Sequence, residues 1–284
     1  MSRGFLKMPY KRVLTIQDIS CFGQCSLTVA LPILSAAGLE TVILPSAVLS
    51  THTAGFTGFT VRDLTGDIPG IAAHWKREGI SFDALYTGYL GSAEQIGMVC
   101  DIADTLLKPG AVTVVDPAMA DNGKLYPAFD LAFVDEMKKL VSRADIVLPN
   151  ITEASYLTGI GYKETYGEDY IRSLTEALLA MGAKTVVLTG VSYDAETTGV
   201  AVHDVNGFAY YRHEKLPQSS HGTGDVYASA FVGAYVQGKS AYDAAAIAAD
   251  YTVACIKYTD GDPQHRYGVK FEPVLPELIK MIGR

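Results

Sequence analysis

Short apolar segments rich in β-branched residues alternate with longer segments of helical periodicity along most of the chain. In the longer segments apolar side chains recur every three or four residues, which is typical of amphipathic helices. The apolar runs of the shorter segments do not alternate with polar residues, which is typical of strands covered on both faces. Strands are expected at 13–17, 40–47, 84–87, 111–115, 145–148 and 185–188. Helices are expected near 25–37 and at 67–78, 92–107, 131–141, 165–181, 223–237 and 241–258.

Two of these helices carry boundary signals. Ser92 is expected to cap the helix 92–107, with Gly110 beyond its end, and Gly182 is expected to stop the helix 165–181. Strands separated by helices of this length form βαβ units with right-handed crossovers. The pattern therefore predicts an α/β fold in which a central, mostly parallel sheet lies between two layers of helices.

The pattern changes after Thr189. Two β-rich segments, 198–203 and 208–213, flank Asn206-Gly207, a pair of residues that favours a tight hairpin turn. The sequence therefore predicts a β-hairpin in the C-terminal part of the chain, which we expect to act as a flap over an adjacent site.

Composition limits the class of protein. Of 284 residues, 49% are hydrophobic and 19% charged, which excludes a disordered chain. No linker divides the sequence, so a single domain is expected at 12–284, preceded by a flexible tail at 1–11. The tail is basic but no apolar run follows it, so it is not interpreted as a signal peptide. No segment reaches the length of a membrane helix, and no membrane association is expected.

Charge and cysteine content narrow the partners. The formal net charge is −8 and no cluster of basic residues is present, so no nucleic-acid partner is expected. The four cysteines are too sparse for a disulfide framework, and their spacing does not suit zinc. Reduced thiols fit a cytoplasmic protein.

The strongest chemical signal is the turn from Ser220 to Asp225, which leads directly into a predicted helix. Its two glycines allow a ligand to approach the backbone N–H groups, and the start of the helix adds partial positive charge. Such a turn can stabilise a transferring phosphoryl group while the neighbouring carboxylate of Asp225 accepts a proton from the attacking hydroxyl. The alternative is that Asp225 simply stabilises the first turn of the helix.

Two further polar clusters directly follow predicted strands. One runs from Asp116 to Asp121 and the other from Pro149 to Glu153. Ligands of parallel sheets lie beyond the carboxyl ends of the strands, where Asp116 and Glu153 would meet and could hold Mg²⁺. Taken separately, the first cluster could be only a turn and Glu153 only a capping residue. The phosphate-binding loop of P-loop enzymes and the glycine fingerprint of dinucleotide-binding folds are both absent.

The chain resembles the pyridoxal kinases of the ribokinase-like superfamily along nearly its whole length. The matching segments are Ile16-Gln17 with Gly23, Ser50-Thr51-His52-Thr53, Thr87-Gly88-Tyr89-Leu90-Gly91, Asp116-Pro117, Pro149-Asn150-Ile151-Thr152-Glu153 and Gly222-Thr223-Gly224-Asp225. The last motif is shared by the whole superfamily. The Thr-Gly-Tyr and His-Thr segments indicate the vitamin B6 branch.

The resemblance implies a three-layer ribokinase-like fold and an ATP-dependent kinase that phosphorylates the 5′-hydroxymethyl group of pyridoxal, pyridoxamine or pyridoxine. It also implies Mg²⁺, a monovalent cation such as K⁺ near the nucleotide, and a homodimer. By the same resemblance Asp225 is the base, and Gly222, Thr223 and Gly224 form the anion hole beside it. The remaining implied roles are nucleotide contacts for Asn150, Glu153 and Thr189, metal contacts for Asp116 and Glu153, and substrate contacts for Thr53 and Tyr89.

One position departs from the family pattern. Pyridoxal kinases similar to this chain usually carry Ser after Ile-Gln, whereas this chain has Asp18. A carboxylate here could pair with the 4′-ammonium group of pyridoxamine, which makes Asp18 a further substrate-binding candidate, or it could be a local cap. Two other functions remain open: a hydroxymethylpyrimidine kinase of the same superfamily and a non-catalytic vitamin or nucleotide carrier. A carrier would have no need of a base beside the two glycines.

Overall fold

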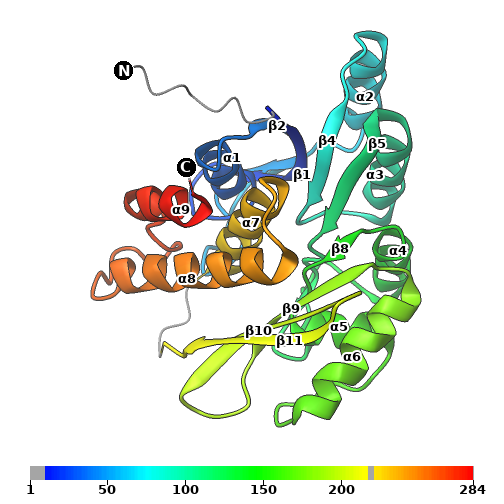
Figure 1. The fold of residues 1–284 in the computed structure, drawn as a ribbon. Coiled ribbons are helices and arrows are strands. Elements are labelled where there is room, and N and C mark those ends of the chain that lie inside the picture. Colours follow the sequence, from blue (N-terminus) through cyan, green and yellow to red (C-terminus); the bar gives the residue numbers. More distant parts are fainter. Residues whose placement is uncertain (1–9, 217–220, 284) are drawn as a thin grey trace, which may run out of the picture.

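A mostly parallel β-sheet runs through the molecule (Figure 1). The computed structural model describes residues 10–216 and 221–283. Within these residues the main sheet has nine strands in the order β11-β10-β9-β8-β5-β4-β1-β2-β3. The strands are β1 (Arg12–Ser20), β2 (Glu40–Leu49), β3 (Val61–Asp63), β4 (Phe82–Thr87), β5 (Leu107–Val115), β8 (Ile146–Val147), β9 (Thr185–Val191), β10 (Thr197–Asp204) and β11 (Gly207–Glu214). Strands β2, β1, β4, β5, β8 and β9 pair in parallel, and the outer strands pair antiparallel.

Helices cover both faces of this sheet, and each face has its own apolar core. One face packs against α1 (Leu27–Ala36), α7 (Thr223–Val236), α8 (Ala241–Thr259) and α9 (Leu275–Ile282). The other packs against α2 (Ile68–Arg77), α3 (Ala93–Leu106), α4 (Leu131–Val141), α5 (Ile151–Thr158) and α6 (Glu168–Met181). The predicted α/β architecture, with a mostly parallel sheet between helical layers, is therefore confirmed. In the described part of the chain no helix is both long and apolar enough to span a bilayer.

Both boundary residues of α3 lie where the sequence predicts, but only Ser92 acts as a cap. Ser92 caps the helix as predicted, since its side chain accepts a hydrogen bond from the Gln95 N–H at 3.2 Å. Gly110 does not terminate it, because α3 ends at Leu106 and the chain passes directly into β5. Gly110 instead lies inside β5 with φ near +78°, in the stretch where pairing with β4 shifts register. A left-handed residue within such an irregularity is best supplied by glycine.

The predicted hairpin is present as β10 and β11, joined at Asn206-Gly207. Its first strand pairs with β9, so the hairpin extends the central sheet. The hairpin was expected to act as a flap over the site. The cavity described below is instead lined by residues 192–195 of the β9–β10 connection, whereas the hairpin tip at Val205 and Asn206 lies at a different cavity.

The elements with no counterpart among the expected helices and strands are strand β3, helices α5 and α9, the 3₁₀ turn Glu272–Val274, and a small hairpin of β6 (Ala120–Asp121) and β7 (Lys124–Leu125). They are short, so they carry little periodicity. Most of the predicted flexible tail lies outside the described residues, as does Ser220 of the glycine turn.

Helix α7 carries Asp225 and is buried on nearly all sides by α1, α8 and the sheet. A helix in this position needs apolar residues all round and small ones where another helix approaches closely. Gly233 meets that need, because a Cβ at this position would lie 2.8 Å from the Ala37 Cβ of the chain segment following α1.

Two helix-interior glycines should therefore respond oppositely to alanine. Gly97→Ala in α3 meets open space and should raise the free energy of unfolding by about 0.5–1 kcal/mol, because glycine is a poor helix former. Gly233→Ala should lower it by about 1–3 kcal/mol through overpacking against α1. Urea unfolding of both variants checks this, and equal changes in the two would contradict the assignment of Gly233 to a tight contact.

Candidate active site

The polar clusters predicted after β5 and β8 meet at one edge of the sheet, around the start of α5. Asn150 is the N-cap of this helix, and its side-chain oxygen accepts from the Glu153 N–H at 2.9 Å. The Glu153 carboxylate accepts in return from the Asn150 N–H at 2.8 Å, which completes a capping box. The other carboxylate oxygen of Glu153 accepts from the Met119 N–H at 3.2 Å. Glu153 therefore links the two clusters, and the capping interpretation considered for it from sequence describes its contacts correctly.

The segment after Asp116 is attached to α5 by further bonds. The Asn150 amide donates to the Ala120 carbonyl at 2.8 Å, and the Thr152 hydroxyl accepts from the Gly123 N–H at 3.0 Å. The turn between Asp121 and Gly123 is the tight turn of the β6–β7 hairpin, as the alternative interpretation of that cluster held. This hairpin forms one wall of a cavity.

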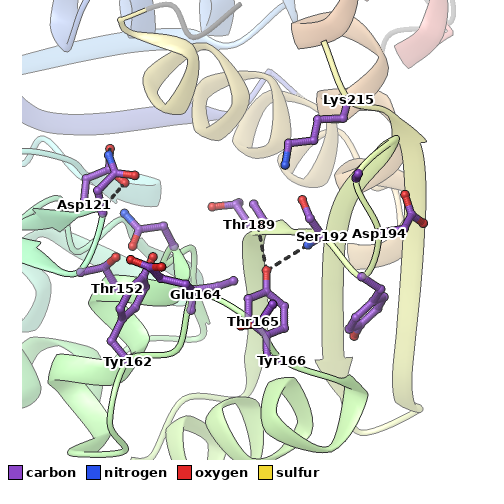
Figure 2. A pocket seen from close by; sticks show the side chains of 16 residues that line it. Asp121, Thr152, Tyr162, Glu164, Thr165, Tyr166, Thr189, Ser192, Asp194 and Lys215 are labelled. Atoms are coloured by element: carbon purple, nitrogen blue, oxygen red, sulfur yellow. Dashed lines mark hydrogen bonds between the residues drawn. The ribbon is translucent and has the colours of Figure 1, made fainter. Parts of the chain in front are cut away.

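The cavity has a volume of about 580 Å³ and opens between the start of α5, the segment before α6 and the β9–β10 connection. Asn150 and Thr189, both predicted from the resemblance to contact ATP, line it side by side, and the Thr189 N–H donates to the Pro149 carbonyl at 2.9 Å. Figure 2 shows Asp121 and Thr152 on one side of the cavity and Ser192 and Lys215 on the other. The Tyr166 hydroxyl accepts a hydrogen bond from the Ser192 N–H at 3.0 Å and so fastens the β9–β10 connection to the loop before α6.

The glycine turn lies at the start of α7, as predicted. Gly222 is the N-cap residue with φ near +75°, and a Cβ at this position would overlap the Gln24 carbonyl. Only glycine suits a left-handed residue in so close a contact. Asp225 follows in the first turn of the helix, where burial raises its pKa to about 7. Asp225 does not line the 580 Å³ cavity.

Asp116 interacts electrostatically with both Glu153 and Asp225, although neither Asp116 nor Glu153 lines the cavity. Burial raises the pKa of Asp116 well above its ordinary value, and the neighbouring carboxylates of Glu153 and Asp225 raise it further. Glu153 is also buried, and this raises its pKa to about 8 despite its bonds to backbone N–H groups. The three carboxyl groups therefore form one interacting cluster, placed between the cavity and the glycine turn.

A fourth carboxylate, Asp18, lies on the other side of Asp225. It sits at a bulge where the pairing of β1 with β2 shifts register, and such bulges re-aim a side chain. Asp18 is 5% exposed, accepts a hydrogen bond from the Ser20 hydroxyl at 3.0 Å, and has a pKa raised by burial. Its charge acts on Asp225 and on Tyr89, so the structure brings together two of the three predicted substrate residues.

Ser26 joins the two carboxylates and was not identified from sequence. Its side chain stabilises the Asp18 carboxylate, and its backbone stabilises that of Asp225, which lowers both pKa values against the effect of burial. Ser26 has φ near +53° and ψ near −132°, a conformation that L-residues rarely adopt. Strain of this kind persists where the surroundings over-determine the backbone, often at functional sites.

The third predicted substrate residue, Thr53, lies on an exposed loop next to the buried His52. The His52 ring packs against Phe56 and His221 at centroid distances of 5.0 and 5.9 Å, and its Nε2 atom lies 3.0 Å from the Tyr267 carbonyl. Because a carbonyl only accepts, Nε2 carries the proton. These contacts hold three loops together beside Asp18.

The residues that sequence reasoning missed are chiefly those on loops: Ser26, Lys215, Tyr166 and Ser192. None belongs to a motif with characteristic spacing. Lys215 directly follows β11, and its ammonium group extends toward the cavity (Figure 2). The only signal for Lys215 in the sequence is a positive charge directly after the predicted hairpin.

The chain is similar to known kinases in sequence and in fold. The phosphomethylpyrimidine kinase family matches residues 57–270. A phosphomethylpyrimidine kinase structure from Bacteroides thetaiotaomicron, solved with pyridoxal, is 36% identical, with a TM-score of 0.90 over 95% of this chain and 96% of that one. The pyridoxal kinase structure from Lactobacillus plantarum is 32% identical, with a TM-score of 0.89 over 96% and 98% of the two chains. A pyridoxal kinase of Leifsonia xyli is 31% identical over 80% of this chain and 81% of its own length.

The carboxylate cluster should make stability fall as pH rises. The pKa of Asp225 in the folded protein, about 7, lies above that of an unfolded Asp, about 3.9, so the folded state binds more protons between these values and loses stability as pH rises through them. Asp225→Asn should therefore reduce the drop in Tm between about pH 5 and about pH 8.

Asp262→Asn is the matched control, because hydrogen bonding from Lys270 lowers the pKa of Asp262 and confines its effect to more acidic solution. Thermal melts of ligand-free protein across this pH range measure both. An undiminished drop in Asp225→Asn would show that its carboxyl group is not the buried acid described here.

Proposed function

The chain belongs to the phosphomethylpyrimidine kinase family of the ribokinase-like superfamily, and from this premise we propose that it transfers the γ-phosphoryl group of ATP to the 5′-hydroxymethyl group of a vitamin B6 compound. The observation that carries the proposal is the position of Asp225. It starts a buried helix beside a left-handed glycine and interacts with Asp116 toward the cavity and with Asp18 on the opposite side. Donor and acceptor sites can therefore meet at one carboxylate.

In this proposal Asp225 is the general base. A base works best when its pKa lies near the working pH, and burial brings that of Asp225 to about 7. The backbone N–H groups of Gly222, Thr223 and Gly224 at the start of α7 form the anion hole for the transferring group. The protein takes little part in the covalent chemistry of phosphoryl transfer. Most of the rate enhancement therefore comes from positioning the two substrates and from stabilising the charge of the transition state.

The cavity between α5 and the β9–β10 connection is proposed to take the nucleotide. Asn150 and Thr189 line it, and the Glu153 carboxylate accepts a hydrogen bond from the Asn150 N–H at the start of α5. The ammonium group of Lys215 extends toward the space where phosphates would lie. The loop around Tyr166 and the β9–β10 connection would shield the donor from water, which limits hydrolysis.

The acidic cluster fits a divalent cation. Asp116 is repelled by both Glu153 and Asp225, and no Lys or Arg forms an ion pair with these three residues in the described part of the chain. In the same part no group of three His, Cys, Asp or Glu side chains forms a metal cage, which suits Mg²⁺ held through one carboxylate, water and phosphates. We propose Asp116 as that carboxylate, with Glu153 adding charge behind it. Bound there, Mg²⁺ would neutralise charge on the β- and γ-phosphates.

Three further features implied by the family resemblance are part of the proposal. A monovalent cation such as K⁺ would bind near the nucleotide. The enzyme would be a homodimer and would work in the cytoplasm.

The activity is tested by coupled ADP release from Mg²⁺-ATP with pyridoxal, pyridoxamine, pyridoxine and hydroxymethylpyrimidine. Hydroxymethylpyrimidine is included because the sequence left this compound open as the alternative acceptor. We expect the highest kcat/KM with a B6 compound. A higher value with hydroxymethylpyrimidine would replace the proposed substrate, and no turnover with any acceptor would reject the kinase.

Asp225→Asn should lower kcat by about 10²–10⁴-fold while leaving KM for both substrates nearly unchanged, as expected for loss of a positioned base. Asp243→Asn is the matched control, because Asp243 is likewise the third residue of a helix, α8, but is exposed and caps only its own helix. It should keep full activity. Near-normal turnover in Asp225→Asn would refute the role assigned to this carboxylate.

Asp18 is proposed to select the amine-bearing substrate. It is buried beside Asp225 with hydroxyl partners, and in the described part of the chain no Lys or Arg pairs with it. A buried carboxylate without a cationic partner is costly, so a cationic ligand group would be stabilised there.

Asp18→Ser should consequently lower kcat/KM for pyridoxamine more than for pyridoxal, by about tenfold in the ratio, which corresponds to about 1.4 kcal/mol. Steady-state assays with both compounds give the ratio directly. Pyridoxine, which carries a hydroxyl in place of the amine, is the internal control and should follow pyridoxal. A ratio that does not change would leave Asp18 with a local structural role only.

A further inference from the structure

A fully buried polar cluster lies beneath the carboxylates, on the α7 side of the sheet. Thr15 and Gln17 of β1, Tyr86 of β4 and Ser229 of α7 each have 0% exposure. Polar side chains are rarely buried together without cost, because each loses its contacts with water. Neither the apolar core nor the proposed roles of the motif residues account for this cluster.

Strand register places the first three members together. Thr15 lies opposite Tyr86 in the β1–β4 pair, and the Gln17 amide donates to the Thr15 hydroxyl at 2.8 Å. The side chain of Gln17 extends over Gly88, where a Cβ would come within 2.7 Å of its Cδ atom. The glycine of the Thr87-Gly88-Tyr89 segment is therefore needed to make room for Gln17.

The same register aims Tyr86 at the carboxylates. Tyr86 lies opposite Val114 in the β4–β5 pair, and Asp116 follows Val114 by two residues, so its side chain is expected on the same face. Ser229 follows Asp225 by four residues, which puts both on one side of α7. The Tyr86 hydroxyl accordingly interacts with the charges of Asp116 and Asp225 and with the side chains of Ser229 and Gln17.

This hydroxyl is a donor without a fixed acceptor. Burial raises the pKa of Tyr86 well above its ordinary value, so the phenol keeps its proton throughout the physiological range. Ser229 and the Gln17 oxygen lie close enough to moderate this rise, but within the described residues neither they nor the Tyr86 hydroxyl have a partner with hydrogen-bond geometry. An unpaired buried donor beside acidic groups is stabilised when a carboxylate oxygen turns toward it.

We propose that Tyr86 is a positioning residue, whose hydroxyl orients the carboxylates of Asp116 and Asp225 for transfer of the phosphoryl group. This inference rests on the proposed kinase function. Tyr86 is fully buried and does not line the cavity. It acts through the two carboxylates, and the side chains of Ser229 and Gln17 lie beside its hydroxyl.

Tyr86→Phe removes one oxygen and tests this directly. Because small misplacements of reacting groups cost rate and not affinity, kcat should fall about tenfold or more, with KM for ATP and for the preferred acceptor within about twofold of wild type. The Kd of pyridoxal, measured by fluorescence titration without nucleotide, should also be unchanged. Melting temperature should change little, since the removed group has no hydrogen-bond partner.

Tyr227→Phe is the matched control. Tyr227 is also buried, on α7 itself, and its hydroxyl likewise has no hydrogen-bond partner in the described residues. Burial is the only cause that raises its pKa, so no carboxylate lies in range. Its kcat should equal that of wild type. Ser229→Ala, a second variant that relaxes the hold on Tyr86, should lower kcat by about threefold and add little further loss to Tyr86→Phe.

The outcomes separate the two proposals. A wild-type enzyme that turns over a B6 compound, with kcat unchanged in Tyr86→Phe or reduced equally in Tyr227→Phe, overturns the role of Tyr86 and leaves the kinase intact. A loss of pyridoxal affinity as large as the loss of kcat also overturns it, because a general structural defect would then be the cause. A wild-type protein inactive with every acceptor overturns both.

Discussion

The arrangement of this molecule depends on four acidic side chains held close together at the carboxyl edge of a parallel sheet. The charge of Asp18 acts on Asp225, and those of Asp225 and Glu153 act on Asp116, while burial raises the pKa of all four carboxyl groups. No salt bridge in the described part of the chain relieves their repulsion. Carboxylates that repel one another stay close only if the rest of the fold holds them there. Such clusters are typical of functional sites, where a bound cation offsets the repulsion.

The fold enforces the cluster through backbone contacts. A bulge in β1 positions Asp18, the capping box of α5 holds Glu153, and the left-handed Gly222 brings the start of α7 against the Gln24 carbonyl. Ser26 then joins Asp18 to Asp225 at the cost of an unfavourable backbone conformation. Each carboxylate is thus held by a different element, and the sheet keeps those elements in register.

The two ends of the cluster differ in their surroundings, and this difference gives the site a direction. Beyond Glu153 lies an open cavity with amide, hydroxyl and ammonium groups, suited to a polyphosphate. Around Asp18 lie the aromatic rings of Tyr89 and the neighbouring loops, suited to a small aromatic ring. Asp225 stands between them, where an alcohol and a phosphoryl group would meet.

The sequence by itself determined the α/β architecture, the hairpin at Asn206-Gly207 and the residues that follow the strands, because hydrophobic period and turn chemistry are local properties. It identified Asp116, Asn150, Glu153 and Asp225 as candidates for the same reason. Only the tertiary structure decided that Ser26 bridges two carboxylates, that Lys215 reaches the cavity, that Gly110 lies inside β5, and that Tyr86 lies beneath the acidic cluster. Those features arise from register shifts and loop packing between distant segments, and such contacts leave no periodic trace along the chain.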